Sequence, residues 1–356
     1  MTDTLRRATV TAVTGLGLCL TLLPAAQAQA QAPTRVACND IAALKAAINN
    51  ANTSGGSIAL APRCVYTLTQ ADNPGDGLPE ITGKVEITGD NTTIDRNSGT
   101  PFRLFHVREG GSLTLKSITV RYGETGTTDS HGGGLLNDHG SLTLIDSTVR
   151  NNRASTGGGI WNQLGTLTLK NTTVSNNHAA FGGGVATNGT MSMQGGALRA
   201  NTGAFWGGGL ANAGDTKLND VSVNGNDSGD RGAGIVTLAI NLETGPLRLN
   251  STKIKGNIAR SNGGGIQTGS DEPTTLHRST VSHNTSNGGP TTGGGIENSG
   301  IILRLFIGTT SDSQRKESTE NSTKLAPHRV ELIQSSVVKN DPTNCAPPNS
   351  VPGCVN

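Results

Sequence analysis

Runs of glycine recur at regular spacing and limit the possible folds more than any other feature of the chain. Six GGG runs and one GAG run begin at Gly132, Gly157, Gly182, Gly207, Gly232, Gly263 and Gly293. The first four intervals are 25 residues each, and the last two are 31 and 30 residues. A repeat of this length is typical of solenoids, in which each copy is one structural unit stacked on the next.

Each copy carries the same internal pattern. An aliphatic residue follows the glycines, and Asn or Thr stands two places after it. Further on, an apolar residue is followed five places later by an aliphatic one, and three places after that by Asn. These triples are Leu144/Val149/Asn152, Leu169/Val174/Asn177, Met193/Leu198/Asn201, Leu218/Val223/Asn226, Leu249/Ile254/Asn257, Leu276/Val281/Asn284 and Leu332/Val337/Asn340.

The apolar residues alternate with polar ones, as in LTL, which predicts short strands. Three such strands fit in one copy, separated by turns rich in Gly, Asn, Ser and Thr. One copy cannot bury its apolar side alone, but stacked copies can if each strand pairs in parallel with its equivalent one copy on. The sequence therefore predicts an all-β, single-stranded parallel β-helix.

The recurring Asn and Gly residues have structural roles in such a stack. A buried Asn must satisfy its amide, and identical Asn residues in successive coils can do so as a hydrogen-bonded ladder. The functional alternative is a row of ligand-binding amides. Glycine supplies positive φ and room at a tight corner. A phosphate cradle is disfavoured, since neither a helix nor Lys-Ser/Thr follows the GGG runs.

The segment 39–53, NDIAALKAAINNANT, is the one good helical stretch. Asn39 or Asp40 can cap it, and Ile41, Leu44 and Ile48 form an apolar stripe. Solenoids need their ends covered, so we expect this helix to close the N-terminal end.

The last copy is interrupted. Its GGGIENSG leads into the second strand only at Val330, so residues 301–329 are interpreted as an insertion, whose polar part we expect to be a flexible surface loop. A recognition loop is the alternative. The predicted organisation is a signal peptide at 1–30 and a β-helix domain at 36–356. The domain comprises a cap with irregular coils (36–131), regular coils (132–300), the inserted loop (301–329) and the last strands with the tail (330–356).

The N-terminus has the regions of a secretory signal peptide: basic Arg6 and Arg7, an apolar run, and Ala-Gln-Ala cleavage sites. The rival interpretation, a membrane anchor, fits less well because the apolar run is too short to span. We therefore expect a secreted, extracellular protein with no membrane span in the mature chain.

Four cysteines remain after the signal, an even number that suggests two disulfides in an exported chain. Of the three pairings, the local one, Cys38–Cys64 and Cys345–Cys354, is favoured because each pair lies at one end of the chain. No CxxC and no nearby His supports a metal site at these thiols.

Composition limits the possible partners and the possible core. A formal net charge of +2 gives no indication of nucleic acid or anionic membrane as a partner. Glycine numbers 50 residues and aromatics make up 3%, so large side chains cannot fill a broad core. Disorder is one outcome of such a composition, and a thin aliphatic solenoid core is the other.

The N-terminal helix, the GGGI…N…L…V..N coils and the secretion signal resemble the pectin-lyase-like superfamily of right-handed parallel β-helix proteins. The glycine-Asn repeat also resembles the repeats of polymorphic outer-membrane proteins. The likeness covers about residues 36–356 and implies the architecture, including the right-handed coil. It does not imply one activity, since the superfamily holds lyases, hydrolases, adhesins and surface proteins.

Enzymes of this superfamily have recognisable sites. The NTD, DD, GHG and RIK motifs of polygalacturonase-like members are absent, and the nearest stretches, NDHG (137–140) and SDE (270–272), lack their partners. Lyases in the superfamily use Arg or Lys as base and often calcium held by acidic groups. The outward row where such a site would lie is mostly apolar: Leu136, Trp161, Ala186, Ala211, Val236, Gln267 and Glu297.

The turns before the glycine runs vary more, and in the resembled enzymes these turns line the substrate groove. Candidate ligand-stacking residues there and on the outward row are Trp161, Phe181, Phe205 and Trp206; the alternative is that they cover the sheet edge and pack on one another. Candidate acid/base residues are Asp129, His131, Asp230 and Arg231. The alternatives are solvated turn residues for the first two and a surface salt bridge for the last two.

These observations favour a secreted β-helix of non-catalytic role that binds glycan, cell-surface or protein partners through its stacked face. The competing hypothesis is a polysaccharide lyase or glycoside hydrolase with a non-standard site. The first needs no cofactor or metal, whereas the lyase alternative brings calcium. The sequence specifies neither the ligand nor the oligomeric state.

Overall fold

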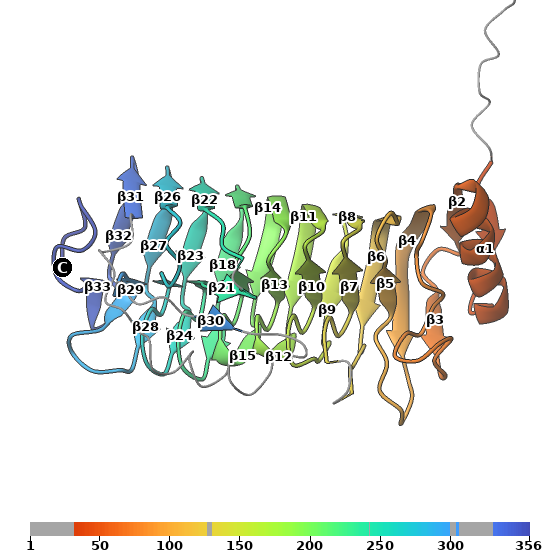
Figure 1. The fold of residues 1–356 in the computed structure, drawn as a ribbon, viewed down its shortest axis with the longest axis horizontal. Coiled ribbons are helices and arrows are strands. Elements are labelled where there is room, and N and C mark those ends of the chain that lie inside the picture. The colour runs from red at the N-terminus through yellow and green to blue at the C-terminus, as the bar shows by residue number, and fades with distance from the viewer. Residues whose placement is uncertain (1–31, 127–129, 242, 300–303, 306–329) are drawn as a thin grey trace, which may run out of the picture. The chain divides into compact units, whose positions relative to one another are not determined.

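The structure, a computed structural model, describes residues 32–126, 130–241, 243–299, 304–305 and 330–356. Residues 32–356 form one compact unit built from stacked coils (Figure 1). The expected signal peptide and most of the expected insertion lie outside the described residues. Within the described ranges, no helix has the length and hydropathy to cross a membrane.

Three parallel sheets run along the stack. Sheet A has 17 strands: β1 (Thr34–Val36), β2 (Gly56–Leu60), β3 (Val65–Leu68), β4 (Lys84–Arg96), β6 (Ser112–Arg121), β8 (Ser141–Ile145), β9 (Thr148–Arg150), β11 (Thr166–Ser175), β14 (Thr190–Arg199), β17 (Thr216–Asn219), β18 (Ser222–Asn224), β22 (Leu247–Asn250), β23 (Lys253–Lys255), β26 (Thr274–His277), β27 (Thr280–Ser282), β31 (Val330–Ile333) and β32 (Ser336–Val338). Sheet B has nine: β5 (Phe105–Val107), β7 (Leu135–Asp138), β10 (Ile160–Gln163), β13 (Val185–Thr187), β16 (Leu210–Asn212), β20 (Ile235–Thr237), β25 (Ile266–Gln267), β29 (Gly293–Glu297) and β33 (Thr343–Ala346).

Sheet C has five short strands: β12 (His178–Phe181), β15 (Thr202–Trp206), β19 (Asp227–Ser228), β24 (Ile258–Ala259) and β28 (Thr285–Ser286). A two-stranded pair joins β21 (Ala239–Ile240) to β30 (Arg304–Leu305). Successive coils pair in parallel at the register that the repeat predicts, as in Ile160 with Val185 and Leu169 with Met193. The predicted all-β parallel β-helix is confirmed.

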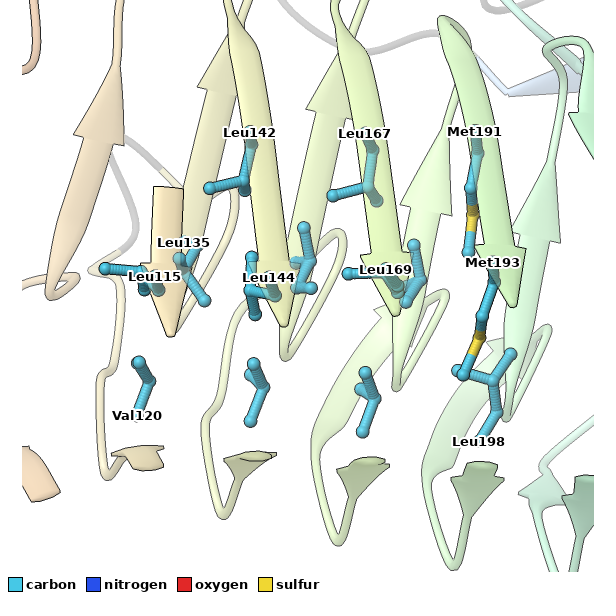
Figure 2. Packing of buried hydrophobic residues seen from close by; sticks show 14 of the residues in the cluster. Leu115, Val120, Leu135, Leu142, Leu144, Leu167, Leu169, Met191, Met193 and Leu198 are labelled. Carbon is cyan, nitrogen blue, oxygen red and sulfur yellow. The ribbon is translucent and has the colours of Figure 1, made fainter. Parts of the chain in front are cut away.

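The core is a column of aliphatic side chains inside the coils. Equivalent residues lie one above another, so that Leu115, Leu144, Leu169 and Met193 form one line of contacts (Figure 2). The side chains of all four are fully buried. Each coil contributes only a few such residues, so the hydrophobic effect stabilises the stack through contact between coils, and one coil could not be stable alone.

Helix α1 (Ile41–Ser54) closes the N-terminal end, as predicted (Figure 1). Asp40 caps it, its Oδ1 accepting a hydrogen bond from the Ala43 amide at 2.9 Å. Leu44 and Ile48 are fully buried and belong to the same core cluster as the coils. Disulfides join Cys38 to Cys64 beside this helix and Cys345 to Cys354 in the tail, which confirms the local pairing.

The Asn ladder is present. Each side-chain amide donates to the Oδ1 of the next ladder residue, from Asn152 through Asn177, Asn201, Asn226, Asn257 and Asn284 to Asn340, at 2.8–3.1 Å. The residue before each ladder Asn has positive φ, as Asn176 does at 54°, which explains the paired Asn in two of the copies. Asn tolerates this conformation better than most side chains.

The first glycine of each run also meets a specific steric requirement. Gly157 has a φ of 62°, and a Cβ there would collide with the carbonyl oxygen of Ile160. Two residues after the aliphatic position a second ladder forms, in which Asn137 Nδ2 donates to Asn162 Oδ1 at 2.7 Å and Asn162 Nδ2 to Thr187 Oγ1 at 2.9 Å. At each of these two polar positions, side chains of successive coils thus bond one another inside the stack, and neither position forms an exposed row of ligand-binding amides.

Candidate functional site

The turn before each glycine run occupies the corner between sheets C and B. Backbone pairing in this corner joins His131 to Thr156, Thr156 to Phe181, Phe181 to Trp206, and Trp206 to Arg231. Residues from five successive coils thus lie in one row along the axis of the β-helix. Because the register of the coils is fixed by their cores, this corner is where side chains can vary without disturbing the fold.

Three aromatic residues gather at this row, Phe181 and Trp206 on it and Phe205 beside Trp206, and we call them the aromatic corner. The ring of Phe181 lies 5.5 Å from that of Phe205 and 5.4 Å from that of Trp206, centroid to centroid. Phe205 remains 55% exposed. The rings do pack on one another, as one of the two interpretations predicted, and they also leave an apolar aromatic surface in contact with water.

Asp230 and Arg231 lie beside the aromatic corner. Trp206 Nε1 donates to Asp230 Oδ2 at 3.0 Å, and Arg231 Nε lies 3.5 Å from Asp230 Oδ1. The predicted surface ion pair is therefore present. Asp230 also fixes the plane of the Trp206 ring, so the carboxylate positions an aromatic side chain in addition to pairing with the guanidinium.

A cavity of about 560 Å³ opens at the same corner, nearer the N-terminus; it is lined by Pro101, Glu124, Thr125, Gly126, Ser130, Arg153, Ala154 and Ser155. It adjoins the aromatic corner because the carbonyl oxygen of Ser155 accepts a hydrogen bond from the Phe181 amide. Sequence reasoning did not find this cavity, since no residue type marks it.

The charges in this cavity do not cancel locally. Glu124 and Arg153 are neighbours across adjacent coils, but Glu124 forms its ion pair with Arg96. Arg153 is exposed and forms no ion pair within the part of the chain that the structure describes. His178 of the next coil pairs with Arg153. Burial of His178 and the positive charge of Arg153 together lower the pKa of His178.

Trp161 and the outward row of sheet B do not form an exposed face, so that prediction is wrong. Trp161 is fully buried, and its Nε1 donates to Gln163 Oε1 at 3.1 Å. It belongs to a second hydrophobic cluster, separate from the core: Leu136, Trp161, Ala186, Ala211, Ala213, Val236, Leu238 and Ile240. The physical reason is that a continuous apolar row is more stable covered than exposed to water. In this structure the Trp161 ring is not accessible to a ligand.

The polar end of the same row is buried too. Glu297 is 5% exposed, and its Oε2 accepts a hydrogen bond from the Gly293 amide at 2.7 Å. Burial raises the pKa of Glu297, while the Gly293 amide and the charge of Arg231 act in the opposite direction. The carboxyl of the outward row is therefore an internal group.

The predicted acid/base pair of Asp129 and His131 cannot be placed, because Asp129 lies outside the described residues. His131 is half-buried, and its ring lies 6.4 Å from the ring of Trp161. His131 thus lies on the row of corner residues and beside the second hydrophobic cluster.

A charged network that the sequence did not indicate lies in the irregular coils near the N-terminus. Asp76 Oδ1 lies 2.8 Å from Arg103 Nε, and Asp76 Oδ2 lies 3.1 Å from His106 Nδ1. Arg108 lies between Glu80 and Asp138, at 3.9 and 3.8 Å. All of these residues except Asp138 precede the regular copies, so no repeat register could predict that they meet.

Comparisons with known proteins assign no function to the chain. No protein-family model matches the chain, and no curated protein matches it. The mannuronan C-5 epimerase AlgE6 A-module of Azotobacter vinelandii has a similar structure, with 14% identity, a TM-score of 0.39, and coverage of 88% of this chain and 96% of that one. The AlgE4 A-module of the same organism has 15% identity, a TM-score of 0.36, and coverage of 86% and 95%.

Likenesses of this size carry no argument about chemistry, and the strand pairing within this chain establishes the architecture. That architecture is the parallel β-helix that the repeat predicts.

Proposed function

We propose that the protein is a secreted β-helix that binds a polysaccharide chain along the corner between sheets C and B, without transforming it. The observation that supports this proposal most directly is the aromatic corner. Phe181 and Phe205 present ring surface to water, and Asp230 and Arg231 lie beside Trp206. Sugar rings have an apolar C–H face that packs on aromatic rings and hydroxyl groups that pair with carboxylate and guanidinium groups.

The cavity beside Ser155 extends this surface by one coil toward the N-terminus. Its walls carry the hydroxyl groups of Ser130, Ser155 and Thr125 together with the Arg153 guanidinium. A row of aromatic and polar groups that follows the stack suits an extended, repeating ligand better than a single small molecule. The binding surface proposed is thus the corner, in place of the stacked face that the sequence suggested.

Two disulfides in the described part of the chain support the extracellular location, since such bonds persist in oxidising compartments. Glycans of cell walls and matrices are abundant there, which fits the proposed ligand.

The test is isothermal titration of the purified chain against a panel of neutral and acidic polysaccharides. We expect Phe205→Ala and Trp206→Ala to weaken binding about tenfold or more, since each removes a stacking surface. Ile258→Ala is the matched control, because Ile258 lies on the same sheet and is 43% exposed but belongs to no aromatic cluster. Binding unchanged in both aromatic variants would exclude the corner.

The enzyme alternative is separated by incubating the same panel with and without calcium. Unsaturated uronide absorbance would identify a lyase, and new reducing ends without absorbance would identify a hydrolase. Either result at a catalytic rate would overturn the non-catalytic role.

A further inference from the structure

We propose that Asp76, Glu80 and His106 form a binding site for a divalent cation of the zinc type. The site lies in the irregular coils, away from the aromatic corner, and does not depend on the function proposed above. One donor atom from each side chain lies within 4.8 Å of the other two. Pairing of Ile81 with Val107 brings Glu80 beside His106, so the fold itself joins the two coils here.

The distances suit tetrahedral coordination. His106 Nδ1 lies 3.1 Å from Asp76 Oδ2 and 3.5 Å from Glu80 Oε1. Zinc bonds to nitrogen and oxygen of roughly 2.0–2.2 Å place neighbouring tetrahedral ligands about 3.4 Å apart. A cation can therefore enter between these atoms with little rearrangement.

Counting protons indicates why a cation fits better than hydrogen bonds alone. Nδ1 carries at most one proton, yet two carboxylate oxygens converge on it. The Glu80 side chain is 38% exposed, so it could turn to water instead. A cation accepts a lone pair from all three groups at once. The remaining ring proton then sits on Nε2, which is buried and without a hydrogen-bond partner. Leaving this one N–H donor unpaired costs far less free energy than coordination of a divalent cation releases.

The surrounding groups hold the ligands in place. Arg103 is fully buried, and its Nε binds Asp76 Oδ1, which leaves Oδ2 for the cation. Arg108 approaches the exposed side of Glu80. Ligating carboxylates commonly have such outer partners. An imidazole ligand favours zinc, cobalt or nickel over calcium and magnesium. Three protein ligands leave a fourth position for water, on the side of Glu80.

The test is titration of the chelator-treated chain with Zn²⁺ alone, followed by calorimetry, and with Co²⁺, whose visible absorption reports tetrahedral coordination. We expect one equivalent of zinc and a raised melting temperature in wild type. Glu80→Gln should weaken zinc binding about tenfold or more, and His106→Gln should remove the cobalt absorption. Glu80 is partly exposed, so its variant should fold even if the His106 variant does not.

Asp138→Asn is the control. Asp138 lies 3.8 Å from Arg108 and pairs with His139, so the change removes a nearby carboxylate but no proposed ligand. Zinc binding by this variant should match wild type. Absence of a one-equivalent site, wild-type affinity in both Glu80→Gln and His106→Gln, loss of binding only in Asp138→Asn, or calcium binding in place of zinc would each overturn the proposal.

Discussion

Replacing Asn201 by Ala should destabilise the protein far more than the loss of one small side chain suggests. Asn201 is fully buried in the middle of the ladder. Its Nδ2 donates to Asn226 Oδ1 at 3.1 Å and to the carbonyl of Val174 at 3.0 Å. Its Oδ1 accepts from both the backbone amide and the Nδ2 of Asn177, each at 3.0 Å.

The magnitude follows from the groups left behind. In the Asn201→Ala variant the Asn177 backbone amide and one proton of its side chain lose their acceptor inside the stack. Each buried group left unsatisfied costs about 1–3 kcal/mol, so we expect a loss of roughly 3–5 kcal/mol. Asn340→Ala should cost less, roughly 1–2 kcal/mol, because Asn340 is half-buried and its removal lets water reach the Asn284 amides that lose their acceptor.

Urea unfolding followed by circular dichroism measures the effect as a shift in midpoint at unchanged slope. Asn224→Ala is the control: Asn224 lies two residues before the ladder and makes one side-chain hydrogen bond, to Ser222. It should stay within about 0.5 kcal/mol of wild type. Equal losses for the Asn201 and Asn340 variants, or a loss for Asn201→Ala no larger than that of Asn224→Ala, would refute the assignment of stability to the ladder.

The remaining predictions concern charge and the tail. The raised pKa of Glu297 means that the folded state binds the Glu297 proton more tightly than the unfolded state does. The free energy of unfolding of the wild type should therefore fall as pH rises from the ordinary pKa of Glu through the raised pKa. Glu297→Gln should lack this dependence when unfolding is measured across pH. Arg153→Gln should raise the pKa of His178 part of the way to its usual value in an NMR titration, because burial of His178 remains; an unchanged value would exclude the charge of Arg153 as a cause. Cys345→Ser should lower the free energy of unfolding by roughly 2–3 kcal/mol, because it opens a closed loop of this length. Thermal unfolding measures the change, with Cys38→Ser as the comparison variant, and an unchanged melting temperature would contradict the prediction.

The repeat predicted most of the fold because one register determines every coil. Once the glycine runs are aligned, Leu144 must lie beside Leu169 and Asn177 beside Asn201, and the structure pairs them so. Local signals were sufficient at the ends, where Asp40 caps the helix and the cysteines lie close along the chain. These features depend on backbone geometry and burial, which residue types record directly.

The site was predictable only where it shares that register. Phe181, Trp206 and Arg231 occupy equivalent turn positions, so their alignment could be read from the repeat, whereas the exposure of Phe205 and the burial of Trp161 depend on what covers each side of the coil. Alternation gives the side of a strand on which a residue lies, but the outer side of a sheet faces water only if no other chain covers it. On the outer side of sheet B, Ile240 of β21 belongs to the same hydrophobic cluster as Trp161, and β21 pairs with β30.

The network of Asp76, Arg103 and His106 was missed for a different reason. These residues lie in coils whose lengths differ from the repeat, so no alignment places them together, and each alone is an ordinary polar residue in a turn. Burial of the charged Asp76 and Arg103 costs stability unless they pair, as they do at 2.8 Å, and a chain that needed only a β-helix could place aliphatic residues there, as its regular coils do. Charged side chains are buried at this point of the irregular coils, and three possible metal ligands meet there, which is the reason to test this cluster for metal before any other surface of the protein.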